Sequence, residues 1–118
     1  MNNVNLFGTL GQNAIVKPFE NGRSVIEFSL ATKETWKDKE DNKQSRTTWH
    51  NCKIFRKTGS TGISEFLKKG AKIIVEQAFL RYQDREIGDR KILQAYVDVE
   101  KVELVSTSNT KEKQKESE

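Results

Sequence analysis

Apolar and polar residues alternate along most of this chain, so that over several stretches every second side chain is apolar. This period of two is the pattern of β-strands that bury one face and expose the other. It predicts five strands, at residues 4–10, 24–32, 47–55, 71–82 and 91–105. The Asn21-Gly22 pair ahead of the second strand is typical of a tight hairpin turn.

A helical pattern lies between the third and fourth predicted strands. Ile63, Phe66 and Leu67 are spaced like one face of a short helix. The polar segments at 33–46 and 83–90 are expected to be loops, the first of them long and mobile. Five strands with a helix between the third and fourth is the order of an OB-fold, a small Greek-key barrel that often binds oligonucleotides. The predicted fold class is therefore all-β, although this order also fits an SH3-like barrel or another small β-barrel.

Length and composition restrict the possibilities further. At 118 residues the chain fits one domain with a modest core, which we expect at residues 1–105. Residues 106–118 contain no apolar side chain and are expected to form a disordered, charged tail. No apolar run approaches the roughly 20 residues that a membrane span needs, and the N-terminus lacks a secretory pattern.

The charge balance and the scarcity of reactive residues narrow the function. A formal net charge of +4 and an isoelectric point near 9.2 suit a polyanionic partner without proving one. The single cysteine, Cys52, and the single histidine, His50, are too few for a disulfide framework, a cysteine-based zinc site or a histidine-dependent triad. We therefore expect a cytoplasmic protein that is not an enzyme and needs neither metal nor cofactor.

The third predicted strand, TTWHNCKIF at residues 47–55, carries the candidate chemistry. Its side chains alternate between two faces: Thr47, Trp49, Asn51, Lys53 and Phe55 against Thr48, His50, Cys52 and Ile54. Because a core rarely buries a lysine, we expect the face with Lys53 to lie in water and to expose both rings. Exposed aromatics beside cations are suited to stacking bases while the cations meet phosphates. The alternative is that both rings pack against a neighbouring element.

Four stretches make the chain recognisable: NNVNLFGTLGQNAIV, NGRSVIEFSLATKETWKDK, TTWHNCKIFRK and FLKKGAKIIVE, which together cover most of residues 2–80. In these stretches the sequence resembles the bacterial single-stranded DNA-binding protein family (SSB). The resemblance implies an OB-fold that coats exposed single strands during replication, recombination and repair. It also implies a cytoplasmic, nucleoid-associated protein that assembles as a homotetramer of four chains.

The resemblance implies roles for individual residues. Trp36, Trp49 and Phe55 match the aromatics on which that family stacks bases. Lys37, Lys57 and Lys69 fall near its backbone-contacting cations. The DNA-binding set that we expect is completed by three residues, namely Lys53, Arg81 and Tyr82. His50 matches a position at the subunit interface of the family.

The chain departs from the family pattern in three places. One is the helix region, which contains Gly59 and Gly62 and is poorer in helix formers than is usual for the family. The family has a further stacking aromatic in a motif like LRTRKW, where this chain reads LRYQDREIGDRK, and Tyr82 is the candidate to replace it. The family also ends in an acidic, apolar tip that docks partner proteins. The segment 106–118 has no large apolar side chain and equal numbers of lysine and glutamate residues. We therefore expect no recruitment of replication or repair proteins through this tail.

Three other functions compete with the binding of single-stranded DNA. A primosome-type or RNA-binding OB protein would use similar chemistry in a different role. A protein-interaction module would bury Trp49 and Phe55 against a partner chain. A nuclease on a small barrel is the least favoured alternative, because no carboxylate cluster accompanies His50.

Overall fold

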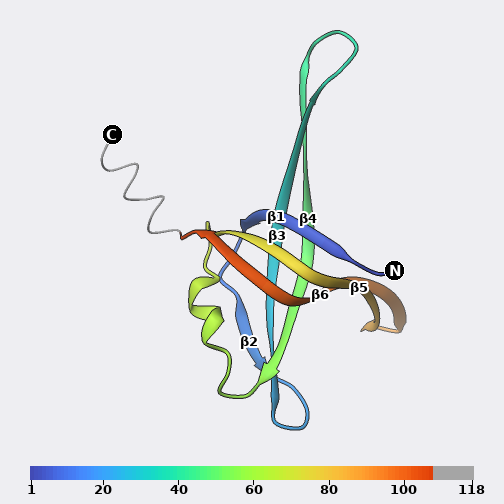
Figure 1. Cartoon of the computed structure of the whole chain (residues 1–118). Helices are drawn as coiled ribbons and strands as arrows, with labels where there is room; N and C mark the ends of the chain where they lie inside the picture. The colour runs from blue at the N-terminus through green and yellow to red at the C-terminus, as the bar shows by residue number, and fades with distance from the viewer. Residues whose placement is uncertain (108–118) are drawn as a thin grey trace.

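The computed structural model describes residues 1–107, which form β-strands and one short helical turn (Figure 1). The elements in chain order are β1 (Val4–Leu10), β2 (Ile15–Pro18), β3 (Arg23–Lys37), β4 (Lys43–Lys57), the 3-10 turn η1 (Gly62–Phe66), β5 (Lys72–Ile87) and β6 (Arg90–Ser106). Apart from its first two residues, the tail predicted at 106–118 lies outside the described residues, and its disorder stays a prediction.

Five of the strands close into a barrel. They follow the order β1-β5-β6-β4-β3, and β1 also pairs with β3, so that the sheet meets itself. The short strand β2, which alternation did not predict, pairs with β3 outside this ring. The contact between β4 and β6 is parallel at Cys52 and Lys53, and the other recorded pairings are antiparallel. The predicted five-stranded OB-type barrel is confirmed.

The barrel core consists of the apolar positions that alternate along the strands. Its fully buried members include Leu10, Ile26, Leu30, Cys52, Ile54, Ile73, Val75 and Val99. Leu67, which follows η1, is buried in the same cluster. Alternation therefore placed the core correctly, because each barrel strand has one wet face and one dry face.

The segment at 33–46, predicted to be a mobile loop, is instead mostly strand. β3 and β4 stay paired as far as Lys37 and Lys43, and they form a ribbon that projects well beyond the barrel (Figure 1). Both faces of this ribbon lie in water, so its side chains carry no apolar alternation to reveal it. We call this segment, residues 33–47, the β3–β4 arm.

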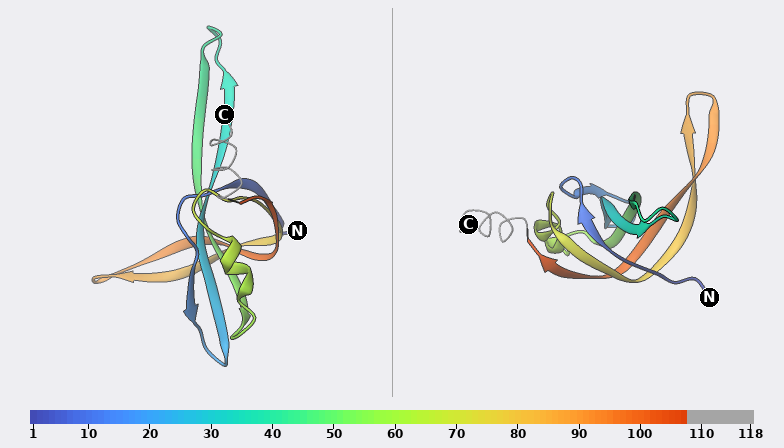
Figure 2. Two further views of the ribbon diagram at one scale, coloured as in Figure 1. Left: turned by 90° about the vertical axis from the view of Figure 1, so that its left-hand side faces the viewer. Right: turned by 90° about the horizontal axis from the view of Figure 1, so that it is seen from above.

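The segment at 83–90, predicted to be a turn region, is also mostly paired strand. β5 and β6 remain in register up to Ile87 and Arg90 around a turn in which Gly88 has a φ of 61°. Figure 2 shows that this second ribbon leaves the barrel in a different direction from the β3–β4 arm. We call this ribbon, residues 81–96, the β5–β6 arm. The prediction failed for the same reason, because a solvated ribbon has no buried face.

The predicted helix is present as the single 3-10 turn η1. Thr61, the N-cap residue just before η1, makes no side-chain cap hydrogen bond, and Gly59 and Gly62 precede the apolar positions. Glycine is a poor helix former, and 3-10 turns are usually short. In the described part of the chain, no helix is long and apolar enough to cross a membrane.

Candidate nucleic-acid interface

The candidate interface is the outward face of β3 and β4. Cross-strand pairing sets Ala31 opposite Trp49, Ser29 opposite Asn51, Glu27 opposite Lys53 and Val25 opposite Phe55. Cys52 and Ile54, the intervening residues of β4, are fully buried in the core. The predicted separation of the two faces is therefore confirmed over the barrel part of β4.

Trp49 is the most exposed of the predicted stacking residues on the barrel, with 60% of its surface accessible. Its indole lies against the backbone of Gly11, in the loop that follows β1. A Cβ atom at Gly11 would stand 2.5 and 2.6 Å from two ring carbons of Trp49. Trp49 also borders a hollow of about 140 Å³ that Asn51 and Leu80 line with it. One side of the ring is thus supported, while most of it faces solvent.

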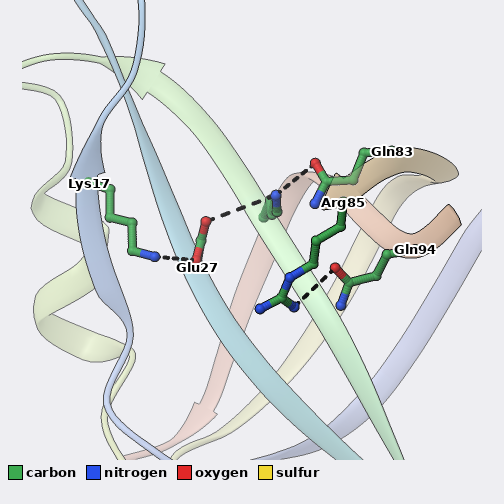
Figure 3. Close-up of polar contacts among 6 residues, drawn as sticks. Lys17, Glu27, Gln83, Arg85 and Gln94 are labelled. Carbon is green, nitrogen blue, oxygen red and sulfur yellow. Dashed lines mark hydrogen bonds and ion pairs between the residues drawn. The ribbon is translucent and has the colours of Figure 1, made fainter. Parts of the chain in front are cut away.

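Lys53 lies in a polar cleft between the barrel face and the β5–β6 arm. Figure 3 shows Lys17 and Glu27 on one side of this cleft and Gln83, Arg85 and Gln94 on the other. The cleft has a volume of about 580 Å³ and is lined by Lys17, Glu27, Ser29, Asn51, Lys53, Gln83, Asp84, Arg85 and Gln94. The lining carries three cations, two carboxylates and several amides or hydroxyls. These groups can meet phosphates and the polar edges of bases.

An ordered network holds the cations of this cleft. Glu27 accepts contacts from Lys17 at 3.2 Å and from Lys53 at 3.9 Å. The Lys53 ammonium also donates to Gln83 at 3.1 Å and lies 4.9 Å from the ring centroid of Tyr96. As a result, only 13% of the Lys53 side chain is exposed. The expectation that this lysine stands in open water is wrong, because the β5–β6 arm covers it with polar groups.

Phe55 is half-buried, which corrects the expectation of an exposed ring. Phe19, from the turn between β2 and β3, packs edge-on against it with the ring centroids 5.3 Å apart. The guanidinium of Arg23 lies 5.4 Å from the Phe55 centroid. Sequence alone did not reveal this cover, because it depends on how the β2–β3 hairpin folds back over the end of β4.

Trp36 lies on the β3–β4 arm, away from the barrel core, and is 44% exposed. Arg46 places its guanidinium 5.8 Å from the Trp36 ring, and Lys37 and Lys43 line a hollow beside the ring. The Lys37 ammonium also pairs with Asp41 at 3.6 Å. The arm therefore presents an aromatic ring among cations, as a stacking site requires.

The tip of the β3–β4 arm is organised by Asp38. One carboxylate oxygen accepts the backbone N–H groups of Glu40 and Asn42, each at 2.9 Å, and the other accepts the Gln44 amide at 3.1 Å. The hydrogen bond from the backbone of Asn42 is the main cause that lowers the pKa of Asp38. The charged form of this side chain therefore closes the turn.

The other predicted DNA-binding residues come from β4, from β5 and from the segment between η1 and β5. Lys57 is exposed at the end of β4, and Lys69 is exposed between η1 and β5. Tyr82 is 58% exposed on the β5–β6 arm. Arg81 instead donates from its Nε to Asp98 at 2.7 Å, and this hydrogen bond raises the pKa of Arg81. Its charge is therefore already partnered by a carboxylate of β6, and all four roles stay predictions.

On the inward face of β4, burial shifts the pKa values of His50 and Cys52. His50 is half-buried, its Nε2 lies 2.8 Å from the hydroxyl of Thr32, and burial lowers its pKa. Burial also raises the pKa of the Cys52 thiol to about 12. Within residues 1–107 no three histidine, cysteine or acidic side chains gather as a metal site would require.

Several residues of this face were not singled out from the sequence. They are Lys17, Phe19, Arg23, Glu27, Gln83, Arg85 and Gln94. Glu27 could have been found from alternation along the second predicted strand, where it faces away from the core. Gln83 and Arg85 could not, because residues 83–90 were interpreted as a turn region. Gln94 lies in the strand predicted at 91–105, but its place in the cleft depends on the pairing of that strand with residues 83–90.

Comparison with known sequences identifies relatives of this chain. The model of the single-strand binding protein family matches residues 1–105. Single-stranded DNA-binding proteins of Neisseria meningitidis, from a serogroup A and a serogroup B strain, are each 40% identical over 76 residues. The match covers 64% of this chain and 43% of each relative, so the chain matches less than half of their length.

Two solved structures share the fold. The Plasmodium falciparum SSB complex with ssDNA superposes with a TM-score of 0.77 at 24% identity, covering 90% of this chain and 96% of that chain. A deletion mutant of the single-stranded DNA binding protein from Thermus aquaticus also gives 0.77, at 21% identity, covering 92% of this chain and 52% of that one. At these identities the likeness is one of fold.

Proposed function

The chain belongs to the single-strand binding protein family, and we propose that it binds single-stranded DNA without regard to base sequence. The observation that carries the proposal is the outward face of β3 and β4. There the exposed ring of Trp49 adjoins a cleft lined by cations and amides, and Asn51 borders both hollows. The fold shared with a structure described as a complex with ssDNA supports the same conclusion.

In the proposed mechanism, bases stack on aromatic rings while cations meet phosphates. Trp36, Trp49 and Phe55 are the stacking residues, each contributing roughly 1–3 kcal/mol per base regardless of its identity. The residues proposed to contact the backbone or support the strand are Lys37, Lys53, Lys57, Lys69, Arg81 and Tyr82. No covalent bond changes in this mechanism, so we propose a binding protein and not an enzyme.

A titration tests this proposal directly. The tryptophan fluorescence should be quenched by poly(dT) and much less by duplex DNA of the same charge. Trp49→Ala should weaken binding about fivefold or more, because a base loses its stacking partner. Equal affinity of the unmodified protein for single-stranded and duplex DNA would overturn the proposal.

Salt dependence tests the phosphate contacts. Each phosphate neutralised on a single strand contributes a slope of about −0.7 to log K against log salt. Replacing Lys37, Lys57 and Lys69 together by glutamine should make the slope shallower by up to about 2. An unchanged slope in this variant would place the phosphate path elsewhere on the barrel. Lys101→Gln serves as the control, because this lysine pairs with Glu76 and Glu103 on β5 and β6.

We propose a role in DNA replication, recombination and repair, in the cytoplasm and in association with the nucleoid. The same titration with oligouridylate separates this role from RNA binding, the main alternative. If the protein is instead a protein-interaction module, neither nucleic acid should quench its tryptophan fluorescence. We also propose that the tail at 106–118 recruits no partner proteins; all but its first two residues lie outside the described part of the chain. Removal of this segment should leave the binding of single strands unchanged.

We also propose that the protein works as a homotetramer with His50 near a subunit contact. Support comes from apolar side chains that the single chain leaves in water, including Phe7 at 57% and Leu80 at 40% exposure. Light scattering should report about four chains at micromolar concentration, and His50→Glu should shift the population to smaller species. A monomeric unmodified protein would refute this assembly without affecting the titrations.

A further inference from the structure

Three side chains, Phe19, Arg23 and Phe55, form a cluster at the end of the β3–β4 face where β2 turns into β3. The two rings meet edge-on at 5.3 Å, and the Arg23 guanidinium lies 5.9 Å from the Phe19 centroid and 5.4 Å from that of Phe55. Phe19 keeps 44% of its surface in solvent, while Phe55 is half-buried. The outer aromatic surface at this end therefore belongs mainly to Phe19.

The backbone holds this cluster in place. The Asn21-Gly22 turn has φ values of 58° and 73°, which suit a tight hairpin, and the N–H of Phe19 donates to the carbonyl of Arg23 at 2.8 Å. The turn is tied to the end of β4, because the N–H of Thr58 donates to the carbonyl of Gly22 at 2.9 Å. Phe19 is thus a positioned side chain at the start of a short, pinned turn.

The charges around the cluster favour an anion. Arg23 is exposed and stands opposite Lys57 in the β3–β4 register, and these two cations outnumber the one carboxylate of the turn, Glu20. Lys17 does not enter this balance, because its ammonium pairs with Glu27 at 3.2 Å. A planar guanidinium can remain over an aromatic ring and still donate hydrogen bonds to a phosphate. Exposed rings with cations beside them are the elements from which sequence-tolerant single-strand sites are built.

We propose that Phe19 and Arg23 form a further nucleotide subsite, in which one unpaired base stacks on Phe19 and an adjacent phosphate binds Arg23. This inference rests on the proposed function and extends the strand path past Phe55. Trp49 and Phe55 are six positions apart on β4, or about 20 Å at the usual rise per residue. Only a strand long enough to span this distance can occupy the subsite and Trp49 together, and a shorter strand is expected to bind at Trp49.

The competing explanation is that Phe19 merely covers Phe55. Phe19→Leu separates the two roles, because leucine keeps an apolar cover but lacks a flat ring. Phe66→Ala is the matched control, since Phe66 is 54% exposed and adjoins an apolar hollow with Leu67 and Leu104. Melting temperatures of all variants establish that affinities refer to folded protein.

The experiment measures affinity for oligothymidylates of increasing length, at several salt concentrations. For long strands, Phe19→Leu and Phe19→Ala should each lower affinity about fivefold or more, which is the expected loss of one stacked base. For the shortest strands that still bind, the loss should vanish. Arg23→Gln should make the salt slope shallower by about 0.7, whereas Arg23→Lys should preserve it.

The outcomes distinguish this inference from the proposed function. If Phe19→Leu and Phe66→Ala bind like the unmodified protein at every length, the subsite is refuted while strand binding stands. A loss with Phe19→Ala but none with Phe19→Leu also refutes it, because cover alone would then suffice. If the unmodified protein shows no preference for single strands, the proposed function itself fails.

Discussion

Gly11→Ala is the substitution for which the structure gives the sharpest expectation. The added methyl group would lie 2.5 and 2.6 Å from two ring carbons of Trp49, while carbon atoms in contact lie about 3.5–4.0 Å apart. The indole must therefore retreat by about 1 Å. It has room to do so, because 60% of its surface faces solvent. Gly11 itself has no positive φ that would strain an alanine.

The expected result is weaker binding with little loss of stability. Stacking on one ring contributes roughly 1–3 kcal/mol, or about 5- to 150-fold in affinity, and this sets the loss for Trp49→Ala. Gly11→Ala tilts the ring without removing it, so its loss should be several-fold and smaller than that of Trp49→Ala. Fluorescence anisotropy of a labelled oligothymidylate measures both variants independently of tryptophan emission.

A double-mutant cycle shows whether the effect passes through the indole. In a Trp49→Ala background, Gly11→Ala should change affinity by no more than about twofold. Gly62→Ala is the control, because nothing lies within 4 Å of the methyl group that it would add. An equal loss with and without Trp49, or no loss at all, would show that support of the ring by Gly11 does not matter for binding.

Three further predictions concern titrating groups. Because burial raises the pKa of Cys52 to about 12, a disulfide reagent at pH 8 should react with this thiol in denaturant and not in the native protein; fast native labelling would contradict its burial. Burial lowers the pKa of His50 in the folded protein. As the pH is lowered below about 6.5, the unfolded chain therefore binds a proton before the folded one does, and the free energy of unfolding should decrease until the pH reaches the folded pKa. Denaturant titrations should show that His50→Gln reduces this fall, and an identical pH profile would refute the assignment. The pKa of Asp38 is also lowered, so its hydrogen bonds should close the arm tip at neutral pH and be lost as acid protonates the carboxylate. Asp38→Ala should likewise accelerate amide hydrogen exchange at Glu40 and Asn42 without changing the melting temperature. Unchanged exchange in this variant would show that the carboxylate does not hold the turn.

The barrel could be predicted from the sequence because a strand with one buried face has an apolar residue at every second position. Each barrel strand has one dry face, and residues such as Ile26, Leu30 and Ile54 record that face at every second position. The same alternation placed Trp49 in solvent. The two arms show no such alternation, because both faces of a free ribbon lie in water. Their polar sequences are compatible with a loop or with a strand.

The details of the candidate site depended on contacts between distant parts of the chain. Lys53 is covered because Gln83 and Tyr96 approach it from the β5–β6 arm. Phe55 is covered because a hairpin turn places Phe19 against it. The periodicity of the sequence predicts which face of a strand a side chain lies on. It does not predict which distant residues strand register and turns place against that side chain, so the exposure of Lys53 and Phe55 was overestimated.

The β3–β4 arm has a thermal consequence. A two-stranded ribbon without a packed face is marginally stable in water, whereas the barrel gains its stability from a shared core. Warming should therefore fray the outer part of the ribbon, where Trp36 lies, at temperatures at which Trp49 is still anchored to the barrel. The two indoles would then report on different melting events within one continuous hairpin, and a strand bound to both would couple those events by holding the outer ribbon closed.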